Sequence, residues 1–199
     1  LHRDFDHRDN FELIHGDILR QDIDSIFEQQ NYSVIANIPY NITSPILRKF
    51  LSKTKNKPDQ MILMVQKEVA DKITVDPFNG KRSILSISVE IYAEPRFGFF
   101  VGRDCFDPAP RVDSAVIHLI TRDKPLVDPE LEMDFFTVVN GGFSEKRKKL
   151  KNSLEKFFGF SADEIFGDID GNTRAEDLRI EDWITLTRNF RDFEQNTVQ

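Results

Sequence analysis

Four consecutive residues, Asn37-Ile38-Pro39-Tyr40, carry groups suited to chemistry on a nucleobase. An exocyclic amine such as N6 of adenine is a poor nucleophile, because its lone pair is delocalised into the ring. The Asn37 side-chain oxygen and the Ile38 carbonyl can accept its two hydrogens, while Pro39 fixes the backbone and offers no competing N–H. Tyr40 provides a flat face on which a base removed from its stack can rest. The alternative is an ordinary turn followed by a core aromatic.

A second aromatic residue, Phe106, begins a proline-containing segment that leads into an apolar stretch. The segment is Phe106-Asp107-Pro108-Ala109-Pro110-Arg111-Val112-Asp113-Ser114-Ala115-Val116. Its two prolines stiffen the loop, so that Phe106 can be held opposite Tyr40. Two aromatic faces that clasp one flipped base are a recurring arrangement in chemistry on nucleobases.

Asp17 is a third candidate, since it ends the apolar segment 11–16. A carboxylate at the end of a strand can accept hydrogen bonds from an amine of a bound nucleoside. The alternative is that Asp17 only caps the helix that follows. No histidine–carboxylate pair stands out as a general base. The amine would then need an electrophile that carries its own good leaving group, as a sulfonium methyl donor does. No metal is expected.

These residues must be positioned by strands that alternate with helices. We expect strands at 11–17, 33–36, 60–65, 96–101 and 115–120, helices at 44–52, 67–74 and 83–93, and a loop at 76–80. Ser44 is the expected N-cap of its helix, with Pro45 at the first helical position. The segment 83–93 also alternates like a strand, but a helix is favoured because a crossover is needed before the next strand.

The alternation predicts a parallel α/β sheet. In such a sheet the carboxyl ends of the strands open on one crevice, which would bring Asp17 and Asn37 together. A linker at 123–129 leads to an all-helical appendix, in which apolar residues repeat with a helical period.

The composition is that of a soluble protein, with 31% of the 199 residues charged and 39% hydrophobic. No apolar run approaches the roughly 20 residues that cross a bilayer, and the polar start does not resemble a signal peptide. Cys105 is the only cysteine, which excludes an internal disulfide and favours a reducing cytoplasm. We therefore expect a cytoplasmic protein without membrane association.

The net charge of −7 argues against indiscriminate nucleic-acid binding. Basic residues nevertheless gather in two stretches, one after the Asn-Ile-Pro-Tyr group and one in the helical appendix. They are Arg48, Lys49, Lys53, Lys55 and Lys57, and Lys146, Arg147, Lys148, Lys149 and Lys151. Both stretches can contact phosphates; a solvated helix face is the alternative.

Several motifs together resemble the ribosomal RNA adenine dimethyltransferase family. They are Asn37-Ile38-Pro39-Tyr40-Asn41, Gln66-Lys67-Glu68-Val69-Ala70, the segment from Phe106 to Val116, Phe143-Ser144-Glu145-Lys146-Arg147-Lys148-Lys149-Leu150 and Arg174-Ala175-Glu176-Asp177-Leu178. They follow in order from about Phe11 to Asn189. The chain is more similar to the small-subunit enzymes than to the antibiotic-resistance enzymes that act on large-subunit RNA.

The resemblance implies a class I, Rossmann-like methyltransferase sheet over residues 1–124 and a helical rRNA-binding domain over 125–199. It also implies S-adenosylmethionine as the donor and dimethylation of two adjacent adenosines near the 3′ end of small-subunit, 16S-type rRNA. The expected partner is the immature small ribosomal subunit, in ribosome biogenesis, and the expected state is a monomer.

The resemblance and the clusters of basic residues together assign residues to three groups. Asp17, Ile18 and Asn37 would meet the donor, and Asn37, Pro39, Tyr40 and Phe106 would frame the target base. The RNA-binding group consists of Arg48, Lys49, Arg111, Lys146, Arg147, Lys148 and Lys149.

One expected family feature does not occur in the sequence. Members begin with a strand and a glycine-rich loop that meets the donor, whereas none of the nine glycines here forms a G-x-G pattern. We therefore expect a sheet that is incomplete at its N-terminal side. Two alternatives stay open: a large-subunit rRNA methyltransferase of the resistance type, and a non-catalytic RNA-binding or ribosome-assembly protein that has lost the donor site. A glycine-rich strand–loop–helix encoded upstream of Leu1 would distinguish these possibilities.

Overall fold

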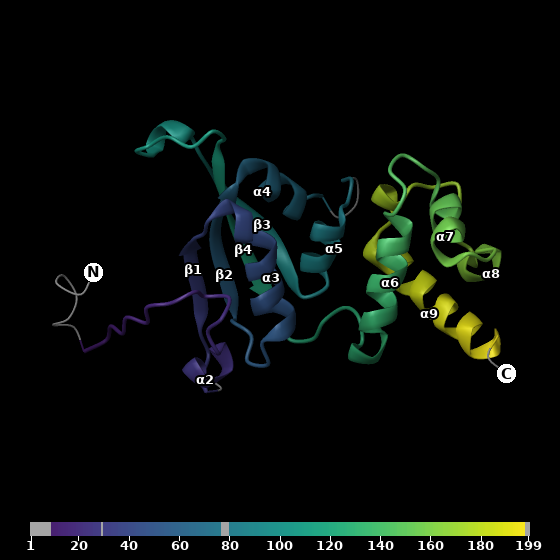
Figure 1. The fold of residues 1–199 in the computed structure, drawn as a ribbon, viewed down its shortest axis with the longest axis horizontal. Coiled ribbons are helices and arrows are strands. Elements are labelled where there is room, and N and C mark those ends of the chain that lie inside the picture. Colours follow the sequence, from purple (N-terminus) through teal and green to yellow (C-terminus); the bar gives the residue numbers. More distant parts are fainter. Residues whose placement is uncertain (1–8, 29, 77–79, 198–199) are drawn as a thin grey trace.

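The computed structural model describes residues 9–28, 30–76 and 80–197 (Figure 1). Its centre is a four-stranded sheet in the order β1-β2-β4-β3. The strands are β1 (Ser33–Asn37), β2 (Gln60–Gln66), β3 (Ala93–Val101) and β4 (Ser114–Thr121). The strands expected at 33–36, 60–65, 96–101 and 115–120 are thus confirmed.

The sheet is mixed, so the prediction of a fully parallel sheet is wrong for β4. β1 pairs with β2 in parallel, whereas β4 is antiparallel to both β2 and β3. The reason is the connection between β3 and β4. It is the loop 102–113, with one short 3-10 turn at Arg103–Cys105, and not a helical crossover, so the chain returns antiparallel. This loop projects beyond the body of the sheet (Figure 1).

The expected strand at 11–17 is not part of the sheet. The segment carries no regular structure, and its apolar residues Phe11 and Ile14 remain exposed. A strand is stabilised by its partner and by the burial of one face, and apolar residues alone do not supply these. Sequence composition therefore suggested a strand that the tertiary structure of the described residues does not contain.

Alternate residues of the central strands form one fully buried face. On β2 these are Met61, Leu63 and Val65, and β4 contributes Ile117 and Leu119. The helices α4 (Lys67–Ile73) and α5 (Ile84–Glu90) pack against strands β2 to β4. Both were predicted; α5 begins with a capping box in which Ser83 and Ser86 bond each other's backbone.

The helix after β1 starts differently from the prediction. A 3-10 turn, Tyr40–Ile42, precedes α3 (Thr43–Arg48), so Ile42 is the N-cap and Ser44 is already inside the helix. Thr43 Oγ1 donates to the carbonyl of Tyr40 at 3.2 Å, which joins the two turns. The α-helix then widens into a π turn, Lys49–Lys53.

The chain beyond the linker is helical, as expected. It contains α6 (Glu132–Gly142), α7 (Leu150–Phe158), α8 (Asp163–Phe166) and α9 (Ile180–Thr197). Trp183 is fully buried among these helices. Gly142 permits this packing, because a Cβ there would lie 2.4 Å from Cη2 of Trp183. This helical part lies beside α5, away from β1 (Figure 1).

Helix α2 (Ile23–Phe27) lies before β1, with Asp22 as its N-cap. Within the described ranges no helix combines the length and hydropathy needed to cross a bilayer. The expected loop at 76–80 falls partly on 77–79, which lie outside the described residues.

Candidate active site

The Asn37–Tyr40 group lies where β1 ends and the 3-10 turn begins. Ile38 is buried and anchors the loop, while Asn37 and Pro39 are exposed on either side of it. No residue of the described chain hydrogen-bonds to the Asn37 side chain, so its oxygen can accept a bond from a ligand. The parallel strand β2 lies next to β1, with Asn37 opposite Met64.

Tyr40 is fixed by its hydroxyl group. The Tyr40 Oη lies 2.6 Å from Oγ of Ser114, the fully buried first residue of β4. The Tyr40 ring itself is only half-buried. Tyr40 is therefore not a fully buried core aromatic, and its contact with a substrate stays a prediction. Ser114 had no role in the sequence analysis, although it lies within the Phe106–Val116 segment.

Hydrogen bonds of Asp113 hold the loop that carries Phe106 at the end next to β4. The Asp113 carboxylate accepts the backbone N–H of Arg103 at 3.0 Å, and the Asp113 carbonyl accepts that of Lys67 at 3.0 Å. Phe106 is half-buried and follows the turn at Arg103–Cys105. The bond between Tyr40 and Ser114 thus connects the Asn37–Tyr40 loop to the end of the Phe106 loop. Opposition of the Tyr40 and Phe106 rings stays a prediction.

Asp17 lies in a turn and is exposed. Its Oδ1 accepts the backbone N–H of Leu19 at 2.9 Å, and its carbonyl accepts that of Arg20 at 2.9 Å. The N-cap of the next helix is Asp22, so the alternative that Asp17 caps α2 is wrong. Hydrogen bonds from Ser25 lower the pKa of the Asp22 carboxyl, as expected for a capping residue.

The predicted RNA-binding residues occupy different environments. Arg48 and Arg111 are exposed, as are Lys146, Arg147 and Lys148 in the turn between α6 and α7. Lys149 donates to the side-chain oxygen of Asn172 at 2.8 Å. Lys49 is different again, because its ammonium group bonds two backbone carbonyls of the same chain.

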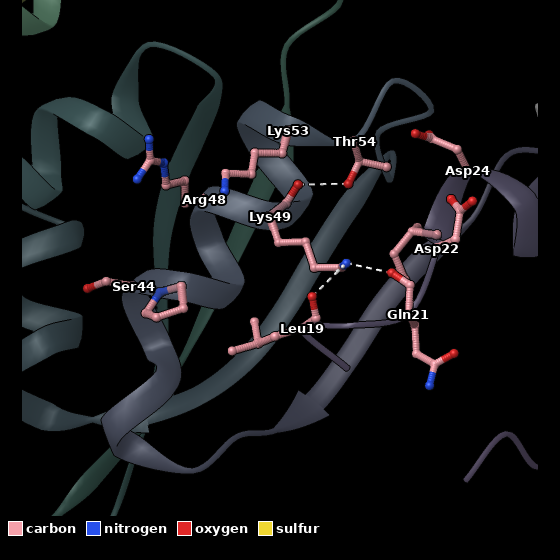
Figure 2. Close-up of a pocket in the computed structure, with 11 residues that line it drawn as sticks. Leu19, Gln21, Asp22, Asp24, Ser44, Arg48, Lys49, Lys53 and Thr54 are labelled. Carbon is pink, nitrogen blue, oxygen red and sulfur yellow. Dashed lines mark hydrogen bonds between the residues drawn. The ribbon is translucent and has the colours of Figure 1, made fainter. Parts of the chain in front are cut away.

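Two cavities flank helix α3. One has a volume of about 530 Å³ and is bordered by the segment 19–24 on one side and by α3 and the π turn on the other (Figure 2). The other has a volume of about 920 Å³ and lies between α3 with the π turn, α5 and most of the length of α6. Ser44 and Arg48 border both cavities.

The residues expected to meet the donor are accessible on the surface. Asp17, Ile18 and Asn37 are all exposed, and two of them carry acceptor oxygens. None of the three borders either of the cavities beside α3. No group of three or more His, Cys, Asp or Glu side chains in the described ranges could hold a metal ion.

Comparison with known proteins shows to which family this chain is related. The sequence model of the family described as "Ribosomal RNA adenine dimethylase" matches residues 1–192. The chain is 38% identical over 187 residues to the "Ribosomal RNA small subunit methyltransferase A" of Dehalococcoides mccartyi strain CBDB1, which covers 91% of this chain and 63% of that protein. The protein of the same name from Bacillus thuringiensis strain Al Hakam is 38% identical over 191 residues, with coverage of 89% and 65%. The chain thus spans less than two thirds of the length of these relatives.

Two solved structures share the fold. A dimethyladenosine transferase from Plasmodium falciparum superposes with a TM-score of 0.77 at 22% identity, covering 94% of this chain and 74% of that one. The 23S rRNA methyltransferase ErmE superposes with a TM-score of 0.72 at 22% identity, covering 96% and 76%. The expected class I methyltransferase fold is therefore confirmed.

Proposed function

The chain belongs to the ribosomal RNA adenine dimethylase family, and on this premise we propose that it methylates N6 of two adjacent adenosines near the 3′ end of small-subunit, 16S-type rRNA. S-adenosylmethionine is the donor, and each adenosine receives two methyl groups. The observation that carries the proposal is the family match over residues 1–192, a range that includes Asn37-Ile38-Pro39-Tyr40 at the end of β1.

The small-subunit substrate is favoured over the large-subunit alternative by the curated relatives. Those at 38% identity carry the name of small-subunit enzymes, whereas the likeness to ErmE is one of fold at 22% identity. A non-catalytic RNA-binding protein is the other alternative. Methyl transfer by the wild-type protein that is lost in Asn37→Ala would exclude it.

The chain's own residues would act on the nitrogen and not on the methyl group. The Asn37 side-chain oxygen and the Ile38 carbonyl accept the two N6 hydrogens, which draws the nitrogen toward a tetrahedral shape. These bonds strengthen as the nitrogen becomes positive, so they stabilise the transition state more than the bound substrate. S-adenosylmethionine, when bound, supplies an electrophilic methyl group with a good leaving group, so no strong general base is needed.

Tyr40 and Phe106 would hold the base. A flipped adenine that stacks on an aromatic face gains about 1–3 kcal/mol. The Tyr40 ring is fixed in orientation by its bond to Ser114, so little of this energy is lost in ordering the ring. Pro39, which precedes Tyr40, restricts the backbone between the two acceptors and the ring.

We also propose that residues 125–199 form a helical rRNA-binding domain. The exposed side chains of Lys146, Arg147 and Lys148 can contact phosphates, together with Arg48 and Arg111 on the sheet side. The partner would be the immature small ribosomal subunit in the cytoplasm, and the protein would act as a monomer in ribosome biogenesis.

Substitution of Asn37 in the full chain tests the proposal. With S-adenosylmethionine and immature small subunits, Asn37→Ala should reduce kcat by about 100-fold or more and leave the Kd for RNA within about twofold. Asn31→Ala is the matched control, since Asn31 is an exposed asparagine before the opposite end of β1. Turnover by Asn37→Ala equal to that of the control would contradict the assigned mechanism, and wild-type protein that methylates only large-subunit rRNA would contradict the substrate.

A further inference from the structure

Lys49 is a basic residue whose ammonium group is directed at the protein itself. It lies where α3 gives way to the π turn Lys49–Lys53. Its Nζ donates hydrogen bonds to the carbonyl of Gln21 at 2.6 Å and to that of Leu19 at 3.2 Å (Figure 2). Hydrogen bonds with a charged donor are about twice as strong as bonds between neutral groups. The two bonds join α3 to a segment nearly thirty residues earlier in the chain.

The backbone of Lys49 is itself held in place. Its carbonyl accepts two bonds from the buried residue Thr54, one from the backbone N–H at 3.0 Å and one from Oγ1 at 2.7 Å. The bond from the Thr54 N–H spans five residues, which is the pattern of the π turn. The lysine side chain therefore extends from a fixed base toward residues 19–21, as Figure 2 shows.

The segment that Lys49 bonds lies outside the sheet and has few other attachments. Helix α2 is held by its own contacts: Ile23 is buried, and the Asp24 carboxylate accepts the backbone N–H groups of Lys55 and Asn56. The preceding turn, residues 17–21, is bonded internally through Asp17. Over the described part of the chain, the side-chain bonds that reach this turn from another element all come from Lys49.

We propose that Lys49 is a positioning residue that fixes the turn carrying Asp17 and Ile18, and not a phosphate contact. This inference rests on the proposed function, in which these two residues meet the donor. An ammonium group has three donors, and two of those of Lys49 already bond carbonyls, so a phosphate could receive only the third. Its neighbours Arg48 and Lys53 border the same cavity, and in the described structure their charged groups form no hydrogen bond or ion pair.

Tryptic cleavage after Arg20 directly tests whether Lys49 fixes the turn at residues 17–21. The Arg20 side chain is exposed, but a protease needs the surrounding backbone to detach before it can cut. In the full chain, Lys49→Met should accelerate cleavage of the Arg20–Gln21 bond by about tenfold. Lys49→Arg should restore most of the protection, because a guanidinium can donate to both carbonyls. Lys53→Met is the matched control from the same cavity and should cleave at the wild-type rate.

Two binding measurements separate positioning from RNA contact. Lys49→Met should weaken binding of S-adenosylhomocysteine about tenfold, and Lys49→Arg should recover it. The slope of log Kd for RNA against log salt should stay unchanged in Lys49→Met, whereas a lost phosphate contact would lower it by about one unit. A lowered slope, or unchanged cleavage in a chain that binds S-adenosylhomocysteine, would overturn the role of Lys49 alone. A wild-type full chain that binds no S-adenosylhomocysteine would instead overturn the proposed function, and the donor side of this inference with it.

Discussion

The hydroxyl groups of Tyr40 and Ser114 lie 2.6 Å apart, although the two residues are 74 positions apart in the sequence. Ser114 is fully buried at the start of β4, whereas the Tyr40 ring is half-buried after β1. The bond therefore holds the hydroxyl end of a half-buried ring. It also connects the two loops that are expected to hold the target base.

The roles of the Tyr40 ring and the Tyr40 hydroxyl can be separated by two substitutions. Tyr40→Phe keeps the flat face and removes the bond to Ser114, so it should retain most methylation and lower the free energy of unfolding by about 1 kcal/mol. Tyr40→Leu removes the face as well and should reduce substrate engagement by about 1–3 kcal/mol. Methyl transfer and urea unfolding should be measured on both. Equal activity of the Phe and Leu variants would exclude stacking by Tyr40.

Phe106 gives the corresponding test on the other loop. Phe106→Leu keeps apolar bulk but loses the aromatic face, so methylation should fall by the equivalent of about 1–3 kcal/mol while the Tm hardly changes. A Leu variant with full activity would remove Phe106 from the site. If activity and Tm fell together, Phe106 would be a packing residue of the loop 102–113.

Much of the fold could be predicted because its signals are local. The apolar runs of β1 and β2 each lie within a single element. The helices α4 and α5 follow from short segments of the sequence. Each signal depends on neighbours that are close in the sequence, where periodicity and capping rules apply.

The remaining features depend on contacts between distant residues. The antiparallel direction of β4 follows from a loop connection that has no sequence period. The partner of Tyr40 and the carbonyls bonded by Lys49 are 74, 30 and 28 positions away. Composition alone grouped Lys49 with the other basic residues, although in the structure its ammonium group bonds two backbone carbonyls.

The exposed turn between α6 and α7 should contribute to RNA affinity through charge. Replacing Lys146 and Lys148 by Gln and Arg147 by Asn should lower the log–log salt slope of RNA binding by about two to three units. Asn is chosen for Arg147 because the backbone φ is 66° there, a conformation that Asn tolerates. Lys72→Gln is the control, since Lys72 is paired with Glu68. An unchanged slope in the triple variant would favour the solvated-surface alternative.

Breaking the buried ion pair between Arg82 and Glu90 should destabilise the protein. Arg82 Nε lies 3.1 Å from a Glu90 carboxylate oxygen, and the two side chains are 2% and 15% exposed. Glu90→Gln leaves the guanidinium buried without this counter-charge and should lower the free energy of unfolding by about 3 kcal/mol. The exposed pair of Glu68 and Lys72 provides the comparison, and Glu68→Gln should cost about 0.5 kcal/mol or less. Equal costs in urea denaturation would contradict the distinction.

Alkaline pH should destabilise the protein through Tyr32. This residue is 8% exposed, stacks on Phe27 with ring centroids 3.9 Å apart, and donates its hydroxyl to the carbonyl of Asn56 at 2.8 Å. Burial, followed by the negative charge of Asp24, raises the pKa of Tyr32 to about 12. In the unfolded chain the pKa is about 10.

Between these two values the unfolded chain loses the Tyr32 proton while the folded chain keeps it, so the free energy of unfolding should fall as pH rises from about 10 to about 12. Tyr32→Phe retains the stack and should be less stable by about 1 kcal/mol at pH 8, because the bond to Asn56 is lost. The difference in free energy of unfolding between wild type and Tyr32→Phe should then narrow above pH 10, since the variant has no proton to lose at this position.

Burial also raises the pKa of Tyr92, so the stability of the variant should still fall somewhat at alkaline pH. Urea unfolding of both proteins at several pH values decides the point, and parallel stability curves would show that Tyr32 does not titrate differently in the two states.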